Sequence, residues 1–383
     1  MSKREIFILH PHFLNYGGAS KVVLELGSQL KKQGFTVKII TTKINKEIIK
    51  DYATLDFISL SNISTGNLFF WILFPFFYFR LSRLLKDLKP TIIFAHSLAI
   101  YWGAAYKFLN KRTLVVNYFH DLGMPYTDSN TEIRGLPFVP RIIASATLPF
   151  FKYLNYKIIK KTDYLVSNSK TSANFIKKKY GRKVDLIVCP GVDVNIFKPS
   201  SSKKSYIYTL GRLDKIKNTD LIIKSFALYC KKYQDKKLKL NIMGDGIEKN
   251  NLIKLSETLN IKNKVIFIGR CNQEKVALIA SRAKIGIFLC PNESFGLAAV
   301  ESMACGTPVI GINTGGISET VMDGKTGALI TDNENMIAEK IHQLLQNQEL
   351  LSEYSQNAVN HARNSFNWDN EAMKLSVFLK SLK

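Results

Sequence analysis

The sequence lacks several patterns that identify common functional classes. Its five cysteines are scattered and include no Cys-x-x-Cys pair, which indicates reduced, mostly packed thiols in a cytosolic protein. No Gly-x-Gly-x-x-Gly run occurs, so the usual fingerprint of a dinucleotide-binding epimerase or dehydrogenase is missing. No recognised nucleic-acid-binding motif is present. There is also no Asp-x-Asp sequence, short repeat or extended low-complexity tail.

The sequence also lacks an apolar run long enough to cross a bilayer. The most apolar segment is GNLFFWILFPFFYFR at residues 66–80, and Pro75 interrupts it. Its apolar core is about a dozen residues, against the roughly 17–25 that a spanning helix needs. Aromatic sequence followed by Arg80, Arg83 and Lys86 is typical of a helix lying in the membrane interface, and we favour that interpretation. An unusually aromatic buried helix is the alternative.

Positive charge, by contrast, is in large excess. The 383 residues include 54 lysines and arginines against 30 acidic residues, a formal net charge of +24. This balance favours anionic partners, namely nucleic acid, phosphorylated ligands or acidic lipid surfaces, although a solvated lysine-rich surface is the simpler alternative. With 46% hydrophobic and 22% charged residues, the chain is globular and long enough for two domains.

Short apolar runs alternate with amphipathic stretches along the whole chain. The opening run, at residues 5–10, is interpreted as a strand rather than a signal peptide because no small-residue cleavage site follows it. Alternation of this kind predicts parallel sheets covered by helices on both faces. The expected strands are EIFILH, TVKIITT, LDFISL, TIIFAH, TLVVNYF, DYLVSN and DLIVCP in the first half, and YIYTLG, LKLNIMG, KVIFIG, IGIFLC and PVIGIN in the second.

The polar run KPSSSKKS, residues 198–205, separates the two series of strands and is predicted to be the interdomain linker. We therefore expect an α/β protein with two Rossmann-like domains facing a cleft, at residues 1–198 and 199–368. The last segment, residues 369–383, is expected to form a helix that crosses back to cap the first domain. Its predicted apolar side comprises Met373, Leu375, Val377 and Phe378.

Two sets of residues follow predicted strands, where open α/β sheets bind ligands. Gly17 and Gly18 follow the first strand and open a helix, so their backbone can approach an anion at the helix N-terminus; a plain tight turn is an equal alternative. Arg212 and Lys217 follow the first strand of the second series. Two cations at one point can neutralise a diphosphate, although exposed loop charge explains them as well.

The stretch NESFGLAAVESMACGTPVIGINTGGISE, residues 292–319, is the most specific. Glu293 is expected on a loop after a buried strand, with helix beginning near Phe295 and Glu301 about two turns into it. The amides of Phe295, Gly296 and Leu297 would then be unsatisfied first-turn donors. Phosphate at the helix start with a carboxylate on each side fits a sugar nucleotide. Either glutamate alone is more commonly a surface or capping acid.

Several motifs, taken together, resemble those of retaining glycosyltransferases with the GT-B fold in the large family 4 (group 1). They are CPGVDVNIFKP, LGRLDKIKN, IMGDG, FIGR, NESFGLAAVESMACGTPVI and GGISETVMDGKTGALI, in family order, and they span roughly residues 160–330. HPHFLNYGGASKVVLELGSQL is a looser match to the family's glycine loop. HPHFLNYGGAS and YFHDL most resemble mannosyltransferases that build lipid-linked oligosaccharides on dolichol-type carriers.

The resemblance implies a role for each matching residue. Arg212 and Lys217 would bind the donor diphosphate with help from the backbone of Gly17 and Gly18, and Glu301 would hold the ribose. Glu293, with the amides of Phe295, Gly296 and Leu297, would hold sugar hydroxyls and the distal phosphate. His120, after the TLVVNYF strand, would lie beside the transferred sugar, although a structural histidine is the alternative there.

The expected reaction is hexosyl transfer with retention, by a front-face route without a covalent nucleophile. Cations in place of a divalent metal would stabilise the leaving phosphate, so no metal and no cofactor are expected. The donor is expected to be GDP-mannose or a UDP-sugar, and the acceptor a lipid-linked or other glycan. The enzyme would be cytoplasmic, peripheral at the cytoplasmic membrane face, and without a nucleic-acid partner. A UDP-sugar-dependent soluble glycosyltransferase and a non-enzymatic nucleic-acid-binding protein are the alternatives.

Overall fold

The computed structural model describes residues 4–14, 17–61, 73–120 and 138–382. The chain divides into two compact units, which we call unit 1 (Met1–Cys189 and Trp368–Lys383) and unit 2 (Pro190–Asn367). The division therefore falls before Pro190 rather than after residue 198.

The predicted linker belongs to unit 2. Within residues 198–205, the ammonium group of Lys203 donates to the carbonyl oxygen of Gly306 and to the hydroxyl of Thr307, both at 2.8 Å. Burial lowers the pKa of Lys203 to about 8. These two contacts pack the segment on unit 2, and the division between the units lies before it, at Pro190.

Unit 1 is built on one parallel sheet with the strand order β3-β2-β1-β4-β5-β6-β7. Alternate residues of β1 enter two separate cores, Ile6 and Ile8 on one face and Phe7 and Leu9 on the other. A strand buried on both faces must be apolar along its whole length, which is why the runs were visible in the sequence. The strands are β1 Glu5–Leu9, β2 Thr36–Thr41, β3 Asp56–Ser59, β4 Ile92–His96, β5 Leu114–Phe119, β6 Tyr164–Ser167 and β7 Leu186–Ile187.

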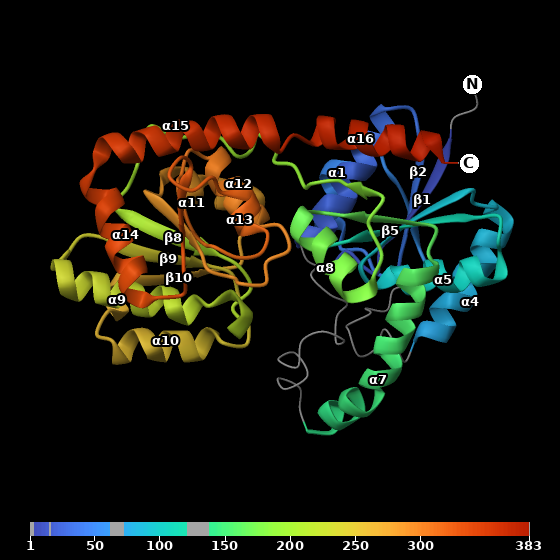
Figure 1. Cartoon of the computed structure of the whole chain (residues 1–383), viewed down its shortest axis with the longest axis horizontal. Coiled ribbons are helices and arrows are strands. Elements are labelled where there is room, and N and C mark those ends of the chain that lie inside the picture. Colours follow the sequence, from blue (N-terminus) through green and yellow to red (C-terminus); the bar gives the residue numbers. More distant parts are fainter. Residues whose placement is uncertain (1–3, 15–16, 62–72, 121–137, 383) are drawn as a thin grey trace. The chain divides into compact units, whose positions relative to one another are not determined.

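Helices cover both faces of this sheet (Figure 1). The core on one face is shared by α1, α2 and α16, and the core on the other by α4, α5, α7 and α8. Since the connections are helical crossovers between parallel strands, both layers follow from the βαβ pattern. The helices are α1 Gly18–Lys32, α2 Lys46–Ile49, α4 Phe74–Leu88, α5 Ile100–Leu109, α7 Phe138–Lys161, α8 Lys170–Tyr180 and α16 Trp368–Ser381.

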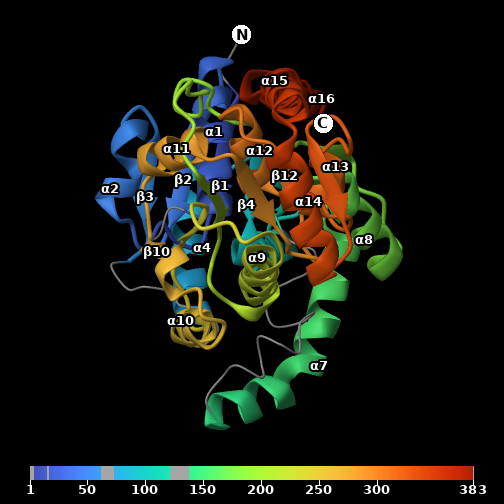
Figure 2. The same ribbon diagram turned by 90° about the vertical axis from the view of Figure 1, so that its left-hand side faces the viewer.

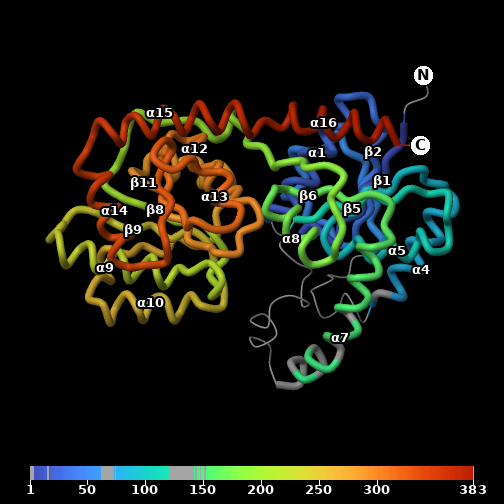
Figure 3. The backbone as a smooth tube through the Cα atoms, in the orientation of Figure 1, coloured from blue at the N-terminus to red at the C-terminus, as the bar shows by residue number. Residues whose placement is uncertain are grey.

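Helix α16 returns to unit 1 and lies along α1 (Figure 3). The residues that it buries include Trp368, Ala372, Leu375 and Leu379. Met373 and Val377, which were predicted on the apolar side, are 55% and 62% exposed. The buried stripe follows the spacing of three and four residues from Trp368 to Leu379. The predicted apolar side therefore lies partly on a different face of the helix from the observed one.

Unit 2 has a parallel sheet with the order β10-β9-β8-β11-β12-β13. Among its helices, α9 and α14 pack side by side (Figures 1 and 2). The strands are β8 Tyr206–Leu210, β9 Lys239–Met243, β10 Val265–Gly269, β11 Ile285–Phe288, β12 Val309–Ile312 and β13 Gly327–Ile330. The helices are α9 Thr219–Tyr233, α10 Lys249–Thr258, α11 Gln273–Arg282, α12 Leu297–Ala304, α13 Ile317–Thr320, α14 Glu334–Gln346 and α15 Gln348–Ser365.

The predicted fold class, two parallel-sheet α/β domains, is confirmed. Every segment expected to be a strand contains one. One observed strand, β13, was not predicted. It is a four-residue edge strand that pairs with β12, and an edge strand this short has little sequence pattern of its own.

The aromatic segment at residues 66–80 lies partly outside the described residues. The part that is described begins α4, and Pro75 occupies its first turn, where a missing N–H costs nothing. Pro75 therefore lies at the start of α4, and the part of the segment before residue 73 lies outside the described residues. Phe77 is buried in the core, whereas Phe76 and Phe79 are 47% and 68% exposed. Among the described residues, no helix combines the length and apolar character needed to cross a membrane.

Candidate active site

The strand order of each unit marks the edge at which parallel α/β sheets generally bind ligands. Such sites lie beyond the carboxyl ends of the strands where the strand order reverses. The reversal falls between β1 and β4 in unit 1 and between β8 and β11 in unit 2. Predicted site residues follow strands at both of these edges.

In unit 2, the loops after β8 and β11 bring Lys217 and Glu293 together. The ammonium Nζ lies 2.6 Å from Oε2 of Glu293, and both side chains are only partly exposed. Burial by itself disfavours the cation, but the adjacent Glu293 carboxylate raises the pKa of Lys217 well above its ordinary value. The side chain of Asn218 donates to the carbonyl oxygen of Leu289 at 3.1 Å, which ties the two loops together. The result is a positioned cation beside a carboxylate.

Arg212 lies on the same loop as Lys217 but in a different environment. Its side chain is 66% exposed and forms an ion pair with Asp214. The structure therefore places the two predicted cations in separate ion pairs. Arg212 is exposed enough to reorient towards a ligand, whereas Lys217 is held by Glu293.

Close backbone contacts between glycine loops fix the shape of this edge. The loops after β8 and β9 pack so tightly that a Cβ on Gly244 would lie 1.8 Å from the carbonyl oxygen of Gly211. One on Gly246 would lie 2.3 Å from the carbonyl oxygen of Leu213. Only glycine fits there. Sequence reasoning assigned no role to Gly244 and Gly246, although the G-D-G pattern directly after a strand was the available signal.

The Gly315-Gly316 pair holds the loop that carries Glu293. The amide of Gly316 donates to the carbonyl oxygen of Glu293 at 2.7 Å. A Cβ on Gly316 would lie 2.3 Å from Cα of Phe295. The two glycines thus allow a second loop to pack directly on the backbone of the Glu293 loop and position its carboxylate.

Helix α12 begins later than predicted. Its first residue is Leu297, and Gly296 caps it with a left-handed φ of 94°. Phe295 therefore precedes the helix, with a buried side chain packed edge-on against Phe366. Glu301 lies little more than one turn into α12, not two, and is buried at 8% exposure. Of the three predicted amide donors, only that of Leu297 belongs to the first turn of α12.

In unit 1, three histidines follow three strands of the sheet. His10 comes directly after β1, His96 ends β4, and His120 comes directly after β5. Nδ1 of His96 lies 2.8 Å from Nε2 of His120. Nε2 of His10 lies 3.3 Å from the hydroxyl of Ser20 in α1. His120 was predicted, but His10 and His96 were missed, although the strand runs EIFILH and TIIFAH both end in histidine.

The three histidines are buried and uncharged. Burial lowers the pKa of His120 to about 3. Burial, reinforced by His120, lowers the pKa of both His10 and His96 well below the usual value. Neutral imidazoles donate through one nitrogen and accept through the other, so this edge presents polar, uncharged groups.

Gly17 and Gly18 lie at the N-terminus of α1, and both are exposed. Gly17 is the N-cap residue and has an extended backbone with φ of −98°. A Cβ on either glycine would meet no described atom within 4 Å. Neither packing nor this backbone conformation therefore requires glycine at the Gly17 cap, and the space beside the α1 amides is open among the described residues.

Within the described ranges, no group of three or more His, Cys, Asp or Glu side chains is arranged to hold a metal ion.

Two family models account for most of the chain. Residues 16–196 match Glycosyltransferase Family 4, and residues 193–361 match Glycosyl transferases group 1. The first match lies mainly in unit 1 and the second in unit 2, so the chain contains the two glycosyltransferase domains that these models describe.

Among curated proteins, the chain is 26% identical to the N-acetyl-alpha-D-glucosaminyl L-malate synthase of Bacillus anthracis, over 87% of this chain and 86% of that protein. It is 24% identical to the D-inositol 3-phosphate glycosyltransferase of Corynebacterium glutamicum, over 94% and 90%. In fold it is similar to a sucrose-phosphate synthase from Thermosynechococcus elongatus (TM-score 0.80, 19% identity, 99% and 98% coverage). It is equally similar to Anabaena HepE in complex with UDP and glucose (0.80, 18%, 99% and 100%).

Proposed function

We propose that this glycosyltransferase transfers a hexosyl group from a UDP-sugar, and that unit 2 binds the donor. The observation that carries this proposal is the Lys217–Glu293 pair at the reversal point of the unit 2 sheet. HepE, a structural neighbour, was solved with UDP-glucose, and the two relatives compared above are not named as mannosyltransferases. These names favour a UDP-sugar over GDP-mannose.

The proposed roles in unit 2 follow from charge and position. Lys217 and Arg212 would neutralise the diphosphate, and Glu301 in α12 would accept from ribose hydroxyls. Glu293, aligned by Lys217, would accept from hydroxyls of the transferred sugar. The α12 N-terminus, beginning with the amide of Leu297, favours a phosphate oxygen.

The remaining assignments concern unit 1 and the course of the reaction. For His120, Gly17 and Gly18 we propose the roles that the family resemblance implies, beside the sugar for His120 and beside the phosphates for the two glycines. The cations would stabilise the charge that grows on the leaving phosphate, which is the main electrostatic contribution that such a site makes. We further propose that transfer retains the anomeric configuration and needs no divalent metal.

Binding and transfer assays test the donor assignment. Calorimetric titration should show UDP binding at least tenfold more tightly than GDP. Radiolabelled transfer from UDP-glucose, UDP-N-acetylglucosamine and GDP-mannose onto membrane lipids and soluble glycans should select a UDP-sugar. Preference for GDP and GDP-mannose would overturn the UDP assignment, and loss of transfer in EDTA would overturn the metal-free one.

Unit 1 also has a surface suited to an anionic membrane, and we propose that it docks there. Helix α7 contains five basic and no acidic residues in its 24 positions. Phe150 and Tyr153 are 61% and 60% exposed. The ammonium groups of Lys157 and Lys160 lie over the rings of Tyr153 and Tyr156, at 5.2 Å and 5.6 Å. Exposed aromatic rings under basic groups are typical of interfacial helices.

Helix α4 adds to the same side of unit 1. It packs in the same core as α7 and exposes Phe76 and Phe79, with the guanidinium of Arg80 5.6 Å from the centre of the Phe76 ring. Each basic residue near an anionic surface contributes about 1 kcal/mol. Each aromatic side chain offers roughly 1.5–3 kcal/mol if fully buried. A few such contacts suffice for reversible attachment, which would bring a lipid-linked acceptor to the enzyme.

Liposome flotation tests this docking. Wild-type protein should float with anionic vesicles of phosphatidylglycerol and phosphatidylcholine. A Phe76→Ser, Phe79→Ser, Phe150→Ser variant should stay in the soluble fraction. Lys157→Glu with Lys160→Glu should also reduce flotation, whereas the matched control Lys236→Glu with Lys237→Glu, on an exposed loop of unit 2, should not. Wild-type protein that fails to float, or equal flotation of all variants, would contradict membrane docking.

A further inference from the structure

The contact between His96 and His120 constrains the protonation of both rings. His96 ends β4, its neighbour in the register on β5 is Tyr118, and His120 follows β5. The two nitrogens are 2.8 Å apart, so one of them donates and the other accepts. Both side chains are buried, at 0% and 8% exposure, so neither ring is open to bulk solvent.

The second nitrogen of His96 decides the direction of this hydrogen bond. Nε2 of His96 is buried and has no hydrogen-bond partner among the described residues. If that nitrogen carried the proton, a buried N–H would be left without an acceptor, which is rarer and more costly than a bare buried acceptor. The proton of neutral His96 therefore belongs on Nδ1.

We infer that His96 is a positioning residue that donates its Nδ1 proton to Nε2 of His120 and fixes His120 in the Nδ1-protonated tautomer. The more common tautomer of free histidine carries the proton on Nε2. Which nitrogen of a buried histidine is protonated is set by the hydrogen bond that the other nitrogen makes. The structure therefore assigns His120 the less common form.

The surroundings hold both rings in place. The His96 ring stacks on Tyr118 at 5.1 Å between centroids, and Phe94 lies edge-on to it at 4.4 Å. The hydroxyl of Tyr118 donates to the carbonyl oxygen of Val188 at 2.7 Å. These contacts fix the angle at which Nδ1 of His96 points. The side chain of Asn168 donates to the carbonyl oxygen of His120 at 2.7 Å and fixes the backbone on the other side of the contact.

This tautomer limits what His120 can do in the reaction, a consequence that rests on the proposed function. With Nε2 accepting from His96, Nδ1 carries the N–H and can only donate. His120 would then act on the transferred sugar or the acceptor as a hydrogen-bond donor to a hydroxyl oxygen. It would not accept the proton of the acceptor hydroxyl as a general base.

Nuclear magnetic resonance of the full chain labelled with ¹⁵N-histidine tests the tautomer directly. Long-range ¹H–¹⁵N correlations distinguish protonated from bare ring nitrogens, and the chain has six histidines, each assignable with a single-substitution variant. At pH 7.5 we expect His120 and His96 both protonated on Nδ1 and bare on Nε2. A His120 ring protonated on Nε2 would overturn the inference.

Three substitutions at His96 separate this role from general packing. His96→Asn keeps a donor near the position of Nδ1 and should leave the His120 tautomer unchanged. His96→Asp provides only an acceptor when ionised and should move the His120 proton to Nε2. His96→Leu should release His120 to the Nε2-protonated form. If the Asp variant, or a folded Leu variant, retains the wild-type His120 spectrum, His96 does not set the tautomer.

Measurements of UDP affinity and of turnover with UDP-glucose then test whether the His120 tautomer affects transfer. They keep this test separate from the proposed UDP-sugar function. UDP affinity should be the same in wild-type protein, His96→Asn and His96→Leu, because unit 2 binds UDP. Turnover with UDP-glucose should fall between about threefold and tenfold in the Leu variant and be restored in the Asn variant. An unaltered turnover in a Leu variant whose tautomer has switched would refute the role in transfer. Absence of UDP binding in wild-type protein would instead refute the proposed function and leave the tautomer result standing.

Discussion

At the residue scale, Lys217 and Glu293 illustrate how a loop can keep a charge in place before a ligand arrives. The ammonium group has lost part of its hydration, and the carboxylate 2.6 Å away replaces it. Because the carboxylate raises the pKa of Lys217, the cation persists throughout the neutral range. A ligand diphosphate would then meet a charge whose orientation is already fixed.

Removal of this charge should weaken nucleotide binding. Lys217→Ala should lower UDP affinity by about tenfold to a hundredfold, the effect of losing one charge-assisted contact of roughly 1.5–3 kcal/mol. Calorimetric titration with UDP measures it. Lys215→Ala is the matched control, since Lys215 lies in the same turn but is exposed. An affinity within twofold of wild type for Lys217→Ala would show that this lysine does not bind the diphosphate.

Gly17 offers a different residue-scale test, because nothing in the described fold requires glycine there. Gly17→Ala should change the free energy of unfolding by less than about 1 kcal/mol, because the lower unfolded-state entropy of alanine is offset by its weaker preference for the N-cap position that Gly17 occupies. It should nevertheless reduce turnover with UDP-glucose severalfold if a phosphate approaches the α1 amides. Gly34→Ala, just beyond the other end of α1 and with φ of 90°, should instead lower the melting temperature. Unaltered turnover in Gly17→Ala would remove this glycine from the site.

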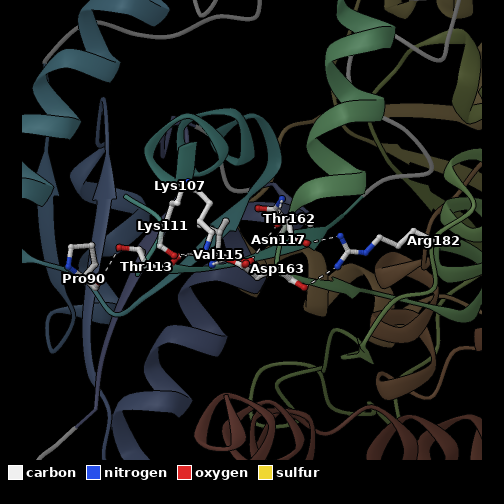
Figure 4. Close-up of polar contacts among 9 residues, drawn as sticks. All are labelled: Pro90, Lys107, Lys111, Thr113, Val115, Asn117, Thr162, Asp163 and Arg182. Atoms are coloured by element: carbon white, nitrogen blue, oxygen red, sulfur yellow. Dashed lines mark hydrogen bonds and ion pairs between the residues drawn. The ribbon is translucent and has the colours of Figure 1, made fainter. Parts of the chain in front are cut away.

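At the element scale, α7 owes its position to contacts at its C-terminal end (Figure 4). The guanidinium of Arg182 donates to the carbonyl oxygens of Ile159 at 2.9 Å and Asp163 at 2.8 Å, and also to those of Lys160 and Thr162. The carbonyls of Ile159 and Lys160 belong to the last turn of α7, where they lack a partner within the helix, and those of Thr162 and Asp163 follow directly after it. One arginine thus closes the end of α7.

The Asp163 side chain continues this anchoring into the sheet. Its Oδ2 accepts from the amide of Val115 in β5 at 2.8 Å and lies 3.0 Å from the ammonium of Lys107 (Figure 4). The Asn117 amide donates to the hydroxyl of Thr162 at 3.0 Å. The proposed membrane helix is therefore fixed to β5 at its C-terminal end, and its exposed aromatic and basic residues extend from Phe150 to Lys160, close to that end.

Loss of the arginine should destabilise unit 1. Arg182→Ala should lower its free energy of unfolding by about 2–3 kcal/mol, because several carbonyls lose a charged donor. Urea unfolding followed by tryptophan fluorescence reports on this unit alone, since the three tryptophans, at positions 71, 102 and 368, all belong to unit 1. The exposed neighbour Lys183→Ala should change the value by less than about 0.5 kcal/mol. Equal stabilities of the two variants would contradict the anchoring role.

At the scale of the whole molecule, the buried histidines make unit 1 sensitive to acid. The pKa values of His10, His96 and His120 lie below the ordinary value of 6.5 because of burial. Below pH 6.5 the unfolded chain therefore binds protons that the folded chain does not, and the folded state loses stability as the pH falls. The loss continues down to the folded pKa, which for His120 is about 3. Each histidine contributes about 1.4 kcal/mol per pH unit in that range.

Between pH 7 and pH 5.5, unit 1 should lose roughly 3–4 kcal/mol in its free energy of unfolding. Urea unfolding with tryptophan fluorescence at the two pH values measures the loss. His96→Asn removes one of the three titrating groups and should reduce the loss by about one third. The same loss in wild-type protein and variant would show that His96 is already charged, or exposed, in the folded state.

The sequence alone determined the elements, the class of fold and the chemical kind of site. Strands buried on both faces must be apolar throughout, so β1 to β12 were each visible as short runs, and glycines and charges after them marked the binding edges. The sequence determined helix faces and helix starts less well. The predicted buried side of α16 and the predicted start of α12 both differ from the observed ones, because each depends on the surface against which the helix packs.

Only the tertiary structure decided which residues meet. Lys217 and Glu293 are 76 residues apart in the chain, and nothing local indicates that they form an ion pair. His10, His96 and His120 lie on three strands whose adjacency depends on the strand order, and the hydrogen bond between two of them depends on register. Gly244 and Gly316 look like ordinary turn residues until the backbones that pass beside them are known. Contacts of this kind arise from the packing of segments that are distant in the chain, so the local sequence does not predict them.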